Sequence, residues 1–141
     1  MSFREKTAWI TLITLIVLLL FYLTHLPPPW WLRANPSGFM FHVLTIGVVA
    51  FVVIELVAYA IMALRAPREA RAPSDEREQL IALKARSIAA RVYPILSLGS
   101  VFVVIHLGAN EGGILYCVFL SFIVSQIVNY AARVAYYRRG R

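Results

Sequence analysis

The residue whose type most clearly suggests chemistry is Glu55, a single carboxylic acid inside the apolar stretch 39–64. An ionisable side chain is costly to bury inside an apolar helix and usually faces the interior of a bundle. One interpretation is a protonatable group on a proton- or cation-coupled transport path. The other is a neutral acid, hydrogen-bonded to an amide, that fixes helix register. We favour the second, because the site has no repeat elsewhere in the chain.

A second group of polar side chains recurs at every fourth residue near the end of the chain. This spacing gives one slowly winding stripe along a helix. Its members are Cys117, Ser121, Ser125, Asn129 and Arg133, with Gln126 beside them. With a rise of about 1.5 Å per residue, Glu55 and Asn129 fall at similar depths in their helices. We therefore predict a buried polar cluster of Glu55, Tyr59, Gln126 and Asn129.

Histidine and cysteine form a third pattern. His25 and His106 lie near the ends of the first and third apolar segments, and His42 and Cys117 lie near the starts of the second and fourth. Because successive segments run in opposite directions, all four are expected at the outer membrane face. Imidazole is both a metal ligand and a haem ligand. The spacing carries no metal signature, and histidine also suits an interface as an amphipathic ring. We expect no cofactor, and a transition-metal or haem site at these four residues is the alternative.

The remaining nucleophiles do not form a catalytic pattern. Ser97, Ser100, Ser121 and Ser125 lie in apolar segments with no histidine at matching depth, and the single cysteine permits no Cys-x-x-Cys motif. The sequence therefore predicts a protein that is not an enzyme.

Composition indicates the elements that hold these residues. Of the 141 residues, 60% are hydrophobic and 15% are charged, which is too apolar for a soluble domain of this size. A helix crosses a membrane with about 20 apolar residues, and segments 8–26, 39–64, 92–108 and 114–136 meet this requirement. The prediction is an all-α, polytopic four-helix bundle forming a single transmembrane domain, residues 1–141. The first segment is too long for a signal-peptide core, so we expect it to be retained.

Basic residues indicate the orientation in the membrane. Of the 14 lysine and arginine residues, 13 lie in the two ends of the chain or between the second and third segments, and Arg33 alone lies on the other side. Lysine and arginine accumulate on the cytoplasmic side of a membrane. We therefore expect cytoplasmic termini and a cytoplasmic loop 65–91, and no nucleic-acid binding despite the net charge of +7.

The loop 65–91 contains an element of its own. After a proline- and charge-rich stretch, Ser74 or Asp75 can cap a helix, with Glu78 placed to close a capping box. An apolar stripe with charges opposite is predicted at Leu80, Ile81, Ile88 and Val92. We expect this amphipathic helix to lie at or emerge from the membrane surface and to run into the third segment. Pro94 should kink it. Its basic surface is available to anionic lipid or to a protein partner, at Arg68, Arg71, Arg77, Lys84 and Arg86.

Two short segments carry a resemblance. Residues 3–9 (FREKTAW) and 75–85 (DEREQLIALKA) resemble an uncharacterised family of small four-span bacterial inner-membrane proteins, in which a D-E-R-(D/E) segment precedes the third span. The resemblance implies this topology and a bacterial inner (cell) membrane. It implies no activity and no site.

Together these patterns favour a small non-enzymatic integral membrane protein that acts as a regulatory, sensory or accessory subunit through its loop helix. Transport through Glu55 and metal or haem binding are the alternatives. The expected partners are membrane lipids, a cytosolic or membrane protein, and a second copy of the chain, because four helices enclose little volume.

Overall fold

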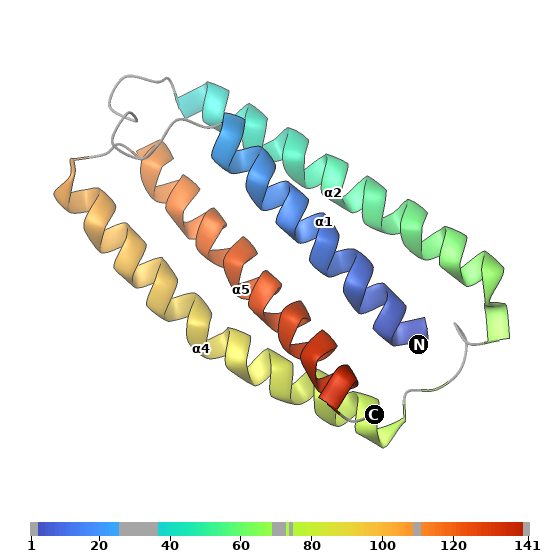
Figure 1. Cartoon of the computed structure of the whole chain (residues 1–141). Helices are drawn as coiled ribbons and strands as arrows, with labels where there is room; N and C mark the ends of the chain where they lie inside the picture. The colour runs from blue at the N-terminus through green and yellow to red at the C-terminus, as the bar shows by residue number, and fades with distance from the viewer. Residues whose placement is uncertain (1–2, 26–36, 69–72, 74, 109–110, 140–141) are drawn as a thin grey trace.

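The computed structural model describes residues 3–25, 37–68, 73, 75–108 and 111–139. It is an all-α four-helix bundle built from α1 (Phe3–His25), α2 (Ser37–Arg65), α4 (Glu76–His106) and α5 (Glu111–Arg139) (Figure 1). All four helices are long and apolar enough to cross a membrane. The predicted fold class is therefore confirmed, and the protein is a multi-pass integral membrane protein.

The two ends of the bundle differ in composition. One end of the bundle holds the start of α1 and the end of α5 (Figure 1). The end of α2 and the start of α4 lie at this same end. We call it the charged end, because it carries Arg4, Arg65 and Arg138. The opposite end, where α1 finishes at His25 and α4 at His106, is the histidine end.

The helices pack in the spatial order α2, α1, α5, α4. Contacts are extensive between α4 and α5, between α1 and α5 and between α1 and α2, whereas α2 touches α5 only slightly. α2 and α4 therefore lie on opposite sides of the central pair (Figure 1). Only 6% of the most apolar stretch of α2 is buried, which is the pattern of a helix whose apolar surface faces lipid.

Two groups of buried residues form the core. The larger lies toward the histidine end and contains Leu18, Tyr22, Leu44, Val104, Tyr116, Cys117 and Ile123. The smaller lies toward the charged end and consists of Ala8, Leu12 and Val134.

Close packing between α1 and α2 depends on one tyrosine and one glycine. The Tyr22 hydroxyl donates a buried hydrogen bond of 2.8 Å to the carbonyl oxygen of Leu44. Gly47 lies one turn further along α2, and a Cβ placed there would lie 2.9 Å from Cε1 of the Tyr22 ring and still closer to its hydroxyl. The absence of a side chain at Gly47 therefore allows the tyrosine to reach the α2 backbone.

Small polar residues join α4 to α5. The Ser125 hydroxyl donates to the carbonyl oxygen of Ala89 at 3.0 Å, and the hydroxyls of Ser100 and Ser121 lie 3.2 Å apart. Small side chains allow helix backbones to approach closely in a membrane, where polar groups must find partners within the protein. Most of the predicted serine and cysteine stripe on α5 thus serves helix packing.

α4 is one continuous helix that joins the loop helix to the third span, as predicted. Two details differ from the prediction. Asp75 is the N-cap residue but makes no side-chain capping hydrogen bond, and Glu78 pairs with Arg4 of α1 instead of closing a capping box. Ser74 lies outside the described residues.

The residues of the predicted apolar stripe on α4 are divided between buried and exposed positions. Ile81, Ala85 and Ala89 are buried, whereas Leu80 is 55% and Ile88 is 37% exposed. Alanine permits close contact with α5, so the small residues and not the larger leucine and isoleucine face the bundle. The helix continues through Pro94 and ends before Gly108, whose positive φ of 68° suits a glycine after a helix.

Candidate functional site

A cavity of about 390 Å³ opens at the charged end and is lined by residues of all four helices. We call it the charged-end pocket. The residues that matter for its chemistry are Arg4, Thr11, Glu55, Tyr59, Glu78, Tyr130, Arg133 and Tyr137. Its volume lies within the range of about 300–1,000 Å³ that is typical of small-ligand sites.

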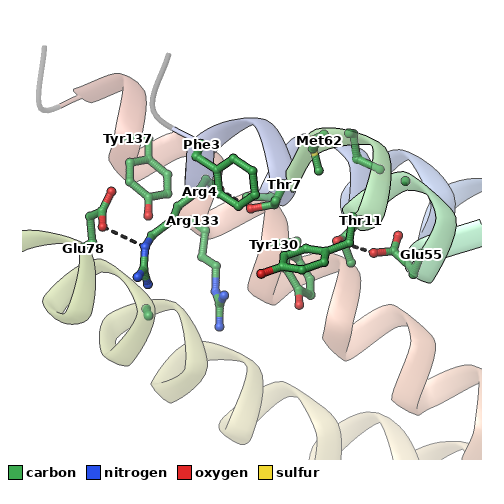
Figure 2. Close-up of a pocket in the computed structure, with 15 residues that line it drawn as sticks. Phe3, Arg4, Thr7, Thr11, Glu55, Met62, Glu78, Tyr130, Arg133 and Tyr137 are labelled. Atoms are coloured by element: carbon green, nitrogen blue, oxygen red, sulfur yellow. Dashed lines mark hydrogen bonds and ion pairs between the residues drawn. The ribbon is translucent and has the colours of Figure 1, made fainter. Parts of the chain in front are cut away.

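Glu55 is held in this pocket from α1. The Thr11 hydroxyl donates a hydrogen bond of 2.9 Å to Glu55 Oε2 (Figure 2). The other carboxyl oxygen, Oε1, is buried and accepts no hydrogen bond from the residues that the structure describes. One carboxyl oxygen is thus fixed, and the second is available to a proton or a ligand.

The residues of the predicted polar cluster lie in two places. Glu55 and Tyr59 line the charged-end pocket, where Tyr59 also makes an edge contact with Phe3 at 5.9 Å between ring centroids. Gln126 and Asn129 lie outside it, and the Asn129 amide donates to Gln126 Oε1 at 3.4 Å. Asn129 continues the stripe that faces α4, while α2 lies on the far side of α1, which keeps the amides away from Glu55.

Sequence reasoning did not identify Thr11 as the partner of Glu55. A depth count is compatible with the pair but does not single it out. Thr11 lies eight residues into α1 and Glu55 ten residues before the end of α2, which is about 12 Å and 15 Å from the same end of the bundle. The same segment contains Thr14 and Thr24, whose hydroxyls bond to carbonyl oxygens of their own helix, so a threonine in it does not by itself indicate a partner on another helix.

Arg133 is the second notable group in the pocket. Its guanidinium carbon lies 4.9 Å from the centre of the Tyr130 ring, a cation–π contact. Its Nε atom is buried and donates no hydrogen bond within the described part of the chain. The four-residue stripe on α5 placed Arg133 on a buried face correctly, but it gave no sign that the residue would line a cavity.

An ion pair connects the pocket to the loop helix. Arg4 Nε lies 3.0 Å from Glu78 Oε2, with the two side chains 43% and 20% exposed (Figure 2). Partly exposed pairs of this kind contribute little to stability, but they fix the relative position of two segments. Here α1 is connected to the first turn of α4.

The basic surface predicted on the loop is only partly described. Arg68, Arg77, Lys84 and Arg86 are exposed, and Arg71 lies outside the described residues. On α4 the exposed Leu80 and Leu83 lie on the face opposite Ala85, flanked by basic side chains.

Each histidine among the predicted metal or haem ligands contacts an aromatic ring of its own helix. His25 stacks on Phe21 at 4.5 Å, His106 lies 4.4 Å from the Phe102 ring, and His42 makes an edge contact with Phe41. Cys117 is buried in the larger core group. Within the described residues, no three histidine, cysteine, aspartate or glutamate side chains are placed to hold a metal ion together.

The charged-end pocket combines two arginines, two glutamates and three phenols beside apolar groups. Such a set can bind a charged or polar group at the edge of the membrane, and its carboxylate can take up a proton. Comparisons with protein-family models, with curated proteins and with solved structures gave no match to this chain.

Proposed function

We propose that this protein is a regulatory or accessory membrane subunit that binds a protein partner through the outward face of the first turns of α4. The observation that carries the proposal is the division of this segment into two faces. Ile81 and Ala85 pack into the bundle, while Leu80 and Leu83 are 55% and 61% exposed.

Charge indicates the chemistry of the partner. Lys84 and Arg91 lie along the outward face beside the two leucines, and both are exposed. A surface with apolar residues flanked by cations complements a partner with an apolar, acid-flanked surface. The Arg4–Glu78 ion pair supports the proposal, because it holds this segment in place from the opposite face.

Site-specific photo-crosslinking in the cells that make the protein tests the proposal. A photoreactive residue at Leu83 should give a discrete protein adduct, and Lys84→Glu with Arg91→Glu should abolish it. The same residue at Leu98, which is 73% exposed on the apolar part of α4, serves as the lipid-facing control. Lipid adducts alone at both positions would contradict the proposal.

A second candidate, proton-coupled transport, is favoured by the unpartnered Glu55 Oε1 in a cavity that opens at one end of the bundle. Liposomes that contain the wild type and an internal pH dye should then show proton uptake, and Glu55→Gln should remove it. Glu76→Gln, at an exposed position outside the pocket, is the matched control. Absence of flux in the wild type rules out this candidate.

A further inference from the structure

Within the part of the chain that the structure describes, Arg133 is the cation in the charged-end pocket without a matching anion. Arg4 is paired with Glu78, and Glu55 accepts a hydrogen bond from Thr11. Arg133 Nε is buried and donates to none of the described residues. A buried guanidinium is stabilised when an anion accepts hydrogen bonds from its N–H groups. Carboxylate and phosphate match the planar arrangement of these donors best.

The surrounding side chains complete an anion site. Figure 2 shows Arg133 projecting into the pocket between Tyr137 and Tyr130. With Tyr59, these residues provide phenol hydroxyls that can donate to an anion. The acidic residues do not fill this role, because Glu78 is held by Arg4 and Glu55 is held by Thr11 on the other side of the pocket.

The other walls of the pocket indicate what carries the anion. Ala58 and Met62 of α2 line it, and the neighbouring Ile61 and Leu64 on α2 are 46% and 82% exposed. An apolar surface therefore leads from the cavity along α2. Tyrosine is enriched at the headgroup level of membranes, where the anionic groups are the phosphates of lipids.

We propose that the charged-end pocket binds the phosphate of an anionic phospholipid, with Arg133 as the principal cation and the acyl chains lying along α2. The tyrosine hydroxyls donate further hydrogen bonds to the phosphate oxygens. This site is independent of the outward face of α4, which lies on the other side of that helix.

Native mass spectrometry of the purified full-length chain tests the proposal. The protein is released from micelles that contain equal amounts of phosphatidylglycerol and phosphatidylcholine. The wild type should retain phosphatidylglycerol preferentially, and Arg133→Gln should weaken this retention about tenfold or more, as expected for the loss of a charge-assisted hydrogen bond. Arg133→Lys keeps the positive charge but loses the planar set of N–H donors, and it should retain phosphatidylglycerol to an intermediate degree.

Arg86→Gln is the matched control, because Arg86 is exposed on α4 and does not line the pocket. Equal losses in Arg86→Gln and Arg133→Gln would mean general attraction to a basic surface and would overturn the proposal. A further arm offers inorganic phosphate alone to lipid-free protein. Binding as tight as that of the lipid would assign the site to free phosphate and overturn the lipid assignment. Circular dichroism of each variant confirms that it is folded.

Discussion

Tyr22 and Gly47 set the distance between α1 and α2, and this contact is sensitive to a single methyl group. Gly47→Ala places a Cβ against the Tyr22 ring and should lower the free energy of unfolding by about 1–3 kcal/mol, the usual cost of overpacking. Denaturant titration of the purified protein in detergent, followed by circular dichroism, measures the change.

Gly99→Ala is the matched control for this substitution. A Cβ at Gly99 meets no atom within 4 Å, so the variant should be as stable as the wild type or more stable. Equal effects of the two glycine substitutions would contradict the packing described for α1 and α2.

Thr11 and Glu55 give a second prediction at the level of residues. Thr11→Val keeps the shape of the side chain but removes the hydrogen bond to Glu55, and it should cost about 0.5–1.5 kcal/mol of unfolding free energy. Thr14→Val is the control, because the Thr14 hydroxyl bonds only to the carbonyl oxygen of Ile10 in its own helix. The same denaturant titration compares the two variants. A larger loss of unfolding free energy in Thr14→Val than in Thr11→Val would contradict the stabilising role of the hydrogen bond between Thr11 and Glu55.

The importance of Glu55 could be predicted from the sequence, whereas its partner could not. A lone acid in an apolar helix must find a polar group, and this requirement holds whatever the arrangement of the helices. Choosing among Thr11, Gln126 and Asn129 requires knowing which helix lies beside α2. Several hydrogen-bond donors lie at about the same depth along the helix axis as Glu55. Only the order in which the helices pack determines which of them reaches its carboxylate.

At the level of elements, α4 packs through its small residues. Ala85 is fully buried against the bundle, whereas Ala90 on the same helix is exposed. Ala85→Leu should therefore force α4 away from its neighbours and lower the free energy of unfolding by about 1–3 kcal/mol, while Ala90→Leu should not. Loss of stability in Ala90→Leu alone would mean that the helix faces the other way.

The Arg4–Glu78 ion pair holds the first turns of α4 to α1. Glu78→Gln should increase backbone hydrogen exchange at the start of α4 and leave residues beyond Pro94 unchanged, because only the local contact is lost. Glu76→Gln, at an exposed position two residues earlier, should have no such effect. Hydrogen exchange with mass spectrometry measures both, and identical exchange in the two variants would contradict the role of the ion pair.

Amphipathic patterning predicted that the loop helix exists and continues into the third span, but it did not indicate which side chains of this helix pack into the bundle. Leucine and isoleucine are the usual core residues in water, where apolar area drives burial. In a membrane, lipid is as apolar as leucine, so close approach through alanine and serine decides the packed face. The capping box failed for a local reason, because Glu78 had a stronger partner in Arg4 of another helix.

At the level of the whole molecule, the bundle is held together by its central pair of helices. α1 packs extensively against α2 and α5, and α5 packs extensively against α1 and α4, while α2 and α4 lie on either side of this pair. Composition and segment length predict four membrane-spanning helices, because any helix crossing about 30 Å of hydrocarbon needs such a segment. The order of the helices depends on contacts between Tyr22 and Leu44 and between Ser125 and Ala89, which no periodicity reveals.

Glu55 lies beside Thr11 of α1 and not beside the pair Gln126 and Asn129 of α5, and this placement depends on the order of the helices. Thiol crosslinking in native membranes tests it most directly, in a Cys117→Ser background. The pair Thr11→Cys with Glu55→Cys should be joined by a short bifunctional thiol reagent, whose spacer replaces the length of the glutamate side chain that brings Glu55 Oε2 within 2.9 Å of the Thr11 hydroxyl. The pair Glu55→Cys with Asn129→Cys should not. Rapid crosslinking of the second pair and none of the first would contradict the helix order and the charged-end pocket built on it.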